Sequence, residues 1–120
     1  MSSPGLGSGA EILSDTQGVD FSAYLERLKR DTTRAWLPLL PQEVEPPLSK
    51  SGVTDIIVTI LPDGTIGDMK LAGSTHDDSI NRAAWGSIVS QGKLPPLPKN
   101  FHGPNLVIRM TYVVNGNLRD

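Results

Sequence analysis

Cysteine is absent from this 120-residue chain, and aromatic residues make up only 5% of it. Without cysteine there is no disulfide, no thiolate nucleophile and no cysteine-ligated metal, so a hydrophobic core must hold the fold. The longest mostly apolar stretches, such as residues 53–61, fall well short of the roughly 20 residues that span a bilayer. With 13 acidic and 11 basic side chains the net charge is −2, which disfavours nucleic-acid binding.

The first 19 residues are small, rich in glycine and serine, and have neither the basic nor the apolar region of a signal peptide. Such a composition buries too little apolar surface to offset the entropy of ordering. We therefore expect a disordered linker over residues 1–19, one domain over residues 20–115, and a short tail over residues 116–120.

A helix is predicted from residue 21 to residue 36, with Asp20 as its N-cap. Its opposite face is charged and mostly basic, which fits either a solvated surface or a docking surface for an acidic partner. Residues 37–52 contain four prolines and predict a stiff connector. The apolar residues that recur at helical spacing are Phe21, Tyr24, Leu25, Leu28, Ala35 and Trp36.

Three strands are predicted. Residues 53–61 are β-branched and alternate in polarity, and Pro62-Asp63-Gly64-Thr65 after them has the composition of a hairpin turn. The returning strand, residues 66–74, needs a bulge near Gly67 to place its apolar residues on one face. The third strand, Leu106–Val114, alternates cleanly.

A second helix is predicted between these strands. Thr75 and Asp78 fit a capping box, and the apolar spacing behind them continues to Gly92. The segment of residues 93–98 holds three prolines, so it should cross the domain as an extended bridge.

The order helix, strand, strand, helix, strand predicts an α+β domain with both helices on one face of a three-stranded antiparallel sheet. If all neighbours are antiparallel, the third strand must pair with the first, which gives the strand order 2-1-3. The third strand is then left as an edge, with backbone groups free for another chain.

These features together resemble the C-terminal domain of TonB-family proteins. The resemblance covers residues 21 to 115 and rests on an ordered set of short motifs. They are Trp36-Leu37-Pro38, Asp63-Gly64, residues 71–74, Ala83-Ala84, Pro95-Pro96-Leu97-Pro98 with Phe101, and the last strand ending before Asn115. The family's tyrosine-proline element before the first strand is replaced here by Pro46-Pro47-Leu48.

The resemblance implies a periplasmic domain of an inner-membrane-anchored energy transducer. Its implied partners are the N-terminal TonB-box peptide and plug of outer-membrane transporters, and an ExbB/ExbD-type motor reached through a membrane helix that this chain lacks. A strand-exchanged homodimer is also possible within such a family. The implied peptide site is the last strand, made of Leu106, Val107, Ile108, Arg109, Met110, Thr111, Tyr112, Val113 and Val114.

Strand addition suits this site because an edge strand pairs through its backbone, while alternate side chains select the peptide. Arg109 can pair with an acidic residue of the peptide, or act as a charge that discourages aggregation at the edge, and the two roles are compatible.

Other functions fit the sequence less well. Catalysis or metal binding at His76-Asp77-Asp78 is disfavoured because helix N-termini attract acidic residues without any chemistry, and His102 is isolated in a turn. We expect no enzyme activity, no metal and no cofactor. The alternatives are a TolA-like envelope-integrity adaptor, whose domain shares this topology by resemblance, and the sensor or adaptor domain of a membrane-anchored signalling protein.

Overall fold

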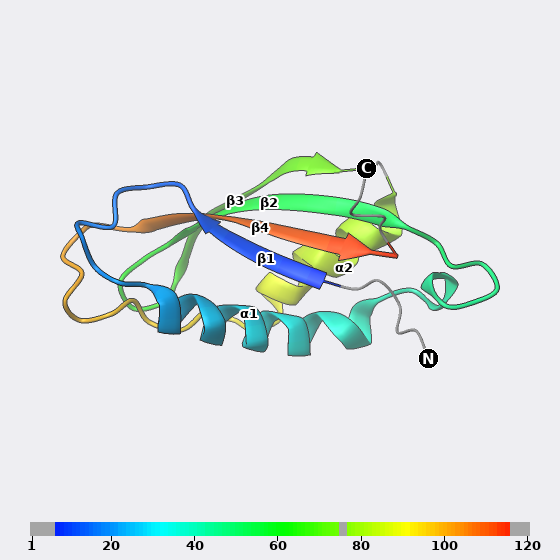
Figure 1. Ribbon diagram of the computed structural model, residues 1–120, viewed down its shortest axis with the longest axis horizontal. Helices are drawn as coiled ribbons and strands as arrows, with labels where there is room; N and C mark the ends of the chain where they lie inside the picture. The colour runs from blue at the N-terminus through cyan, green and yellow to red at the C-terminus, as the bar shows by residue number, and fades with distance from the viewer. Residues whose placement is uncertain (1–6, 75–76, 116–120) are drawn as a thin grey trace.

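The computed structural model describes residues 7–74 and 77–115 (Figure 1). No helix within these ranges is long and apolar enough to cross a membrane. The elements run in the order β1 (Gly7–Ile12), α1 (Ser22–Trp36), η1 (Leu37–Leu39), η2 (Gln42–Val44), β2 (Gly52–Ile60), β3 (Ile66–Ser74), α2 (Asp78–Val89) and β4 (Leu106–Val114), where η denotes a 3-10 turn.

The sheet has four strands in the order β1-β4-β2-β3, and every neighbouring pair is antiparallel. The prediction of a three-stranded sheet with the order 2-1-3 is therefore wrong. Residues 7–12, which composition assigned to a disordered linker, form β1 and pair with β4. As a consequence β4 lies between β1 and β2 and is not an edge strand.

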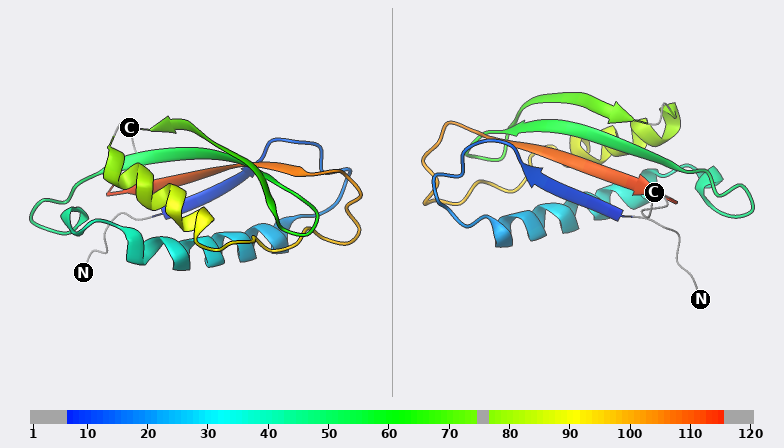
Figure 2. Two further views of the ribbon diagram at one scale, coloured as in Figure 1. Left: turned by 180° about the vertical axis from the view of Figure 1, so that it is seen from behind. Right: turned by 45° about the horizontal axis from the view of Figure 1, so that its top comes forward.

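Both helices lie on the same side of the sheet (Figures 1 and 2). Along β2 and β4 every second residue is buried beneath these helices and the residues between them are half-buried on the open face. This alternation is the period of two expected of a sheet covered on one side. The fully buried side chains of the two strands include Ile56, Val58, Ile60, Leu106, Ile108 and Tyr112.

The hairpin between β2 and β3 is confirmed. Asp63 accepts a hydrogen bond from the Thr65 N–H at 2.9 Å, and Gly64 takes a positive φ of 92°. The bulge is also confirmed, because Ile60 pairs with Ile66 while Thr59 pairs with Asp68, which leaves Gly67 as the extra residue.

The helix starts differ from the sequence prediction by one or two residues. Asp20 does accept a hydrogen bond from the Ser22 N–H at 2.9 Å, but the N-cap position of α1 is Phe21, which has no side-chain cap. The N-cap of α2 is Asp77, whose carboxylate accepts from the backbone N–H groups of residues 79 and 80. Thr75, predicted for that role, lies outside the described residues.

The proline bridge after α2 is anchored to the hairpin and to α1. The Leu94 N–H donates to the Gly64 carbonyl at 2.9 Å, and the Tyr24 hydroxyl donates to the Pro95 carbonyl at 2.8 Å. Trp36, at the end of α1, is 1% exposed and packs edge-on against Tyr112 of β4, with ring centroids 5.2 Å apart. The core thus ties α1, the bridge and β4 into one unit.

Candidate partner-binding edge of the sheet

The predicted partner-binding strand, β4, divides its side chains between two faces. Five of them point into the core and are buried. The other four, Val107, Arg109, Thr111 and Val113, are half-buried on the face away from the helices. These four are the side chains of β4 that stay accessible on the open face of the sheet.

The backbone edge of β4 is covered by β1. The pairing runs from Gly7 opposite Val113 to Ile12 opposite Ile108, and continues where the Leu13 N–H donates to the Val107 carbonyl at 2.8 Å. Antiparallel strands alternate between hydrogen-bonded and non-hydrogen-bonded pairs. The backbone groups of odd-numbered β4 residues therefore face β1, and those of even-numbered residues face β2.

The chain beyond β1 stays close to β4 and to the turn before it. The Val107 N–H donates to the Ser14 hydroxyl at 3.0 Å, and the His102 N–H donates to the Gln17 side chain at 3.2 Å. The edge of β4 thus holds an extended segment of this chain mainly by backbone pairing, with side-chain hydrogen bonds to Ser14 and Gln17 beyond the end of β1.

Charged and polar groups line the open face beside this edge. The Thr111 hydroxyl donates to Asp55 of β2 at 2.7 Å. The Nε of Arg109 is buried and has no hydrogen-bond acceptor among the described residues. Glu11 of β1 is exposed and lies directly opposite Arg109.

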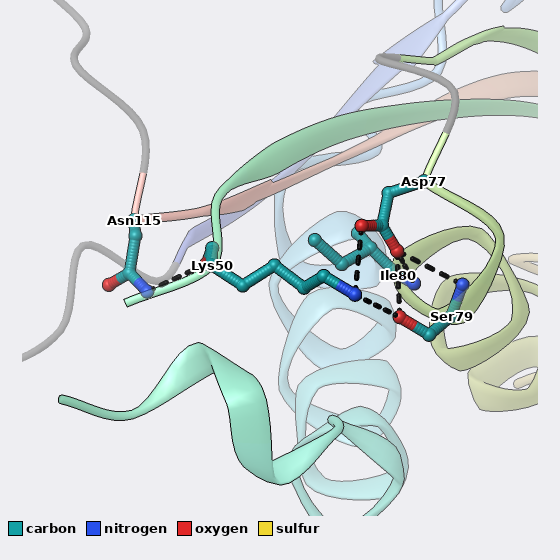
Figure 3. Close-up of polar contacts among 5 residues, drawn as sticks. All are labelled: Lys50, Asp77, Ser79, Ile80 and Asn115. Carbon is teal, nitrogen blue, oxygen red and sulfur yellow. Dashed lines mark hydrogen bonds and ion pairs between the residues drawn. The ribbon is translucent and has the colours of Figure 1, made fainter. Parts of the chain in front are cut away.

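A polar cluster fixes the far end of β4 (Figure 3). Asn115, which follows β4, donates through its side-chain amide to the Lys50 carbonyl at 2.9 Å, and the Lys50 ammonium lies 3.0 Å from a carboxylate oxygen of Asp77. Hydrogen bonds from Ser79 and from the Ile80 N–H, with a further one from Lys50, lower the pKa of Asp77 to about 2. The end of β4, the start of β2 and the N-terminus of α2 are therefore held together.

The opposite edge of the sheet, formed by β3, is less suited to strand addition. Its pairing with β2 shifts register at two places, near Gly67 and near Ala72, and the strand carries the exposed Asp68 and Lys70. Bulges and charges of this kind are what natural sheets use to block pairing at an edge.

The basic face of α1 was the other predicted docking surface. Arg27 pairs with Asp31 at 3.6 Å along the helix, and a shallow groove is lined by side chains that include Lys29, Arg30 and Arg34. Exposed charges at this spacing are typical of a solvated helix face, so the groove by itself indicates no particular ligand.

Within the sequence His76-Asp77-Asp78, Asp77 has a structural role. Asp77 caps α2 and binds Lys50, and His76 lies outside the described residues. Across residues 7–74 and 77–115, no three histidine, aspartate or glutamate side chains come close enough to hold a metal ion. His102 is exposed in the turn before β4.

The sequence did not predict β1, the strand that covers the candidate edge of β4. Its only periodic signal is the placement of Ala10 and Ile12 on either side of Glu11, and the remaining residues are glycine and serine. Three alternating residues do not distinguish a strand from a linker.

The fold and the edge define a small α+β domain whose sheet accepts an extended segment beside β4. A family model described as the TonB C-terminal domain matches residues 21–110, which is well over half of the chain. The chain therefore belongs to the TonB C-terminal family. No curated protein and no solved structure matches it. The matched region begins after β1, so the strand that covers β4 lies outside the part that this chain shares with the family model.

Proposed function

We propose that this chain is the periplasmic partner-binding domain of a TonB-like energy transducer. In this proposal the N-terminal TonB-box segment of an outer-membrane transporter pairs in extended form with β4, and the domain supports active uptake. A membrane helix outside this chain joins it to an ExbB/ExbD-type motor in the inner membrane. Family membership supports this role over the TolA-like and signalling alternatives.

One observation carries the proposal. The edge of β4 already pairs with an extended segment, β1, over six consecutive residue pairs. Because β-augmentation depends on main-chain hydrogen bonds, an edge that pairs with one extended segment can pair with a different extended segment whose side chains fit the same face. The transporter peptide takes the position that β1 has in this structure.

The test is a calorimetric titration of the chain with TonB-box peptides, using a variant that damages only the edge. Both Thr111 variants are made in a chain that also carries Gly9→Pro, which removes a β1 N–H that faces β4, so that β1 no longer competes for the edge. In this background Thr111→Pro removes an N–H that the peptide needs, and we expect it to weaken peptide binding about tenfold or more while circular dichroism shows a folded domain. Thr111→Val is the matched control, because it removes the hydroxyl bond to Asp55 and keeps the N–H. Equal binding by the two variants would contradict strand addition at β4.

A further inference from the structure

The strand β1 is anchored to the core less firmly than β4, with which it pairs, or β2. Of its six residues, all of which the structure describes, none is buried. Ala10 and Ile12 contact the core only partly, and the Ser8 hydroxyl shares a hydrogen bond with Thr33 of α1 at 3.0 Å. By contrast, every second residue of β2 is buried. Pairing of β1 with β4 therefore depends mainly on backbone hydrogen bonds.

Two glycines of β1 leave space over the open face of β4. Gly7 lies opposite Val113 and Gly9 opposite Thr111, and an added Cβ at either glycine would meet no heavy atom of the described chain within 4 Å. Neither glycine takes a positive φ, so a β-branched residue fits the backbone at both places. Glycine in a strand loses more conformational freedom than other residues and makes no cross-strand contact. A strand with larger side chains at these two places would bind β4 more tightly than β1 does.

The third position on this face favours an acidic residue. Glu11 lies opposite Arg109, whose Nε is buried without an acceptor among the described residues. A buried guanidinium N–H without an acceptor is costly, and a carboxylate is the partner that such a group binds best. Glu11 does not bond this Nε in the structure, so a strand that replaces β1 needs a carboxylate here to match the charge that β1 already offers, and it gains on β1 where its carboxylate reaches the Nε.

We propose that β1 is a displaceable occupant of the β4 edge, and that the peptide replacing it carries β-branched residues opposite Val113 and Thr111 and an acidic residue opposite Arg109. The inference rests on the proposed function and specifies the chemistry of its partner. Counted along the peptide, these places are the first, third and fifth, because β1 runs antiparallel to β4. Small or apolar residues fill the second, fourth and sixth places, as Ser8, Ala10 and Ile12 do in β1.

The departing strand stays attached to the domain. Residues 13–21 join β1 to α1, and within that stretch Gln17 and Gly18 both take positive φ values, of 55° and 77°. Because β1 is tethered, it competes with a peptide at a high local concentration. A peptide binds only the molecules in which β1 is unpaired, so its apparent dissociation constant is the intrinsic one divided by that unpaired fraction. Substitutions within β1 leave the β4 edge itself intact, so those that strengthen β1 pairing must weaken peptide binding and those that weaken β1 pairing must strengthen it.

The experiment uses the full 120-residue chain and a labelled synthetic peptide with the sequence of residues 7–15, in which valine replaces both glycines. The double variant Gly7→Val/Gly9→Val tightens β1, and we expect it to bind this peptide about tenfold more weakly than the wild type. Gly9→Pro removes an N–H that faces β4, and we expect it to bind about fivefold or more tightly. Fluorescence anisotropy measures both dissociation constants.

Gly73→Val is the matched control on the opposite edge. Gly73 belongs to β3, and an added Cβ there would make an ordinary contact with Asp55 at 3.5 Å. We expect its affinity for the peptide to equal that of the wild type. If Gly7→Val/Gly9→Val and Gly9→Pro both bind the peptide as the wild type does, β1 is not the occupant that the peptide displaces, and the inference is overturned.

A second measurement needs no peptide. Backbone amides of Arg109, Thr111 and Val113 face β1, whereas those of Ile108 and Met110 face β2. We expect the first group to exchange hydrogen at least tenfold faster than the second, and the glycine-to-valine double variant to slow only the first group. Equal protection of the two groups would also overturn the inference.

The two proposals fail in different ways. If TonB-box peptides do not bind any variant while the β1-derived peptide follows the expected order, the proposed function is wrong and β1 is still displaceable. If TonB-box peptides bind with the same affinity to the wild type and to all three glycine variants, the proposed function survives and displacement of β1 is excluded.

Discussion

Glu11 of β1 lies directly opposite Arg109 of β4, and the buried Nε of that arginine has no acceptor among the described residues. Cross-strand pairs of opposite charge contribute roughly 0.2–1 kcal/mol. The arginine is therefore placed to read the charge of whichever strand occupies this edge.

Replacing this arginine should alter selectivity rather than folding. We expect Arg109→Gln to weaken binding of an acidic edge peptide by about two- to fivefold and to leave a peptide with glutamine at that place unaffected. Lys70→Gln, on the exposed part of β3, is the control and should change neither affinity. The two domains, wild type and Arg109→Gln, and the two peptides form a double-mutant cycle that gives the coupling energy of the pair. Calorimetry measures the four dissociation constants, and a second salt concentration shows whether the coupling is screened as an ion pair is. An equal loss for both peptides would mean that Arg109 does not read the acidic residue.

The core contact between α1 and β4 should dominate stability. Trp36 is 1% exposed and packs edge-on against Tyr112, so its truncation leaves a large cavity. We expect Trp36→Ala to lower the free energy of unfolding by about 3–5 kcal/mol. Urea denaturation followed by circular dichroism measures it. Trp36→Phe keeps much of the apolar surface and should cost clearly less, while a loss below about 1 kcal/mol for alanine would refute the packing role.

The hairpin turn should tolerate no side chain at Gly64. Its φ of 92° disfavours other residues, and an added Cβ would overlap the carbonyl oxygen of Leu94. Gly92 also has a positive φ, of 74°, but no described heavy atom lies within 4 Å of an added Cβ. We expect Gly92→Ala to cost about 1–2 kcal/mol of unfolding free energy and Gly64→Ala about 1–3 kcal/mol more. Equal costs in thermal unfolding would contradict the close approach of the proline bridge.

Acid should weaken the cluster that holds the end of β4. The pKa of Asp77 is lowered to about 2, chiefly by hydrogen bonds from Ser79, whereas an unfolded aspartate titrates near 3.9. A lowered pKa means that the stabilisation is complete above about pH 4 and is lost as the pH falls toward 2.

The variant Asp77→Asn keeps an N-cap side chain and removes the charge. We expect its stability deficit to shrink between pH 4 and pH 2, as measured by urea denaturation at several pH values. Asp68→Asn, on the exposed surface of β3, is the control for the change of one unit in net charge. A deficit that stays constant over this range would show that the charge of Asp77 does not stabilise the fold.

Local patterns account for most of the fold. Alternation placed β4 at Leu106–Val114, and turn chemistry placed the hairpin at Gly64. The phase of the apolar residues in the returning strand required the bulge near Gly67. Helical spacing also predicted the burial of Trp36. Each of these features depends on residues close together in the chain, where side-chain periodicity and permitted φ values act directly.

The sequence by itself determined which residues of β4 face the core and which face outward, because that choice follows from a period of two. Only the tertiary structure decided what covers its backbone edge. Residues 7–12 carry too few apolar side chains to specify a strand, yet they form β1 because the sheet leaves unpaired N–H and C=O groups along β4. Backbone pairing depends little on side-chain type, so the sequence pattern of residues 7–12 does not show that they pair with β4. The folded chain decides that pairing, because it brings β1 beside β4.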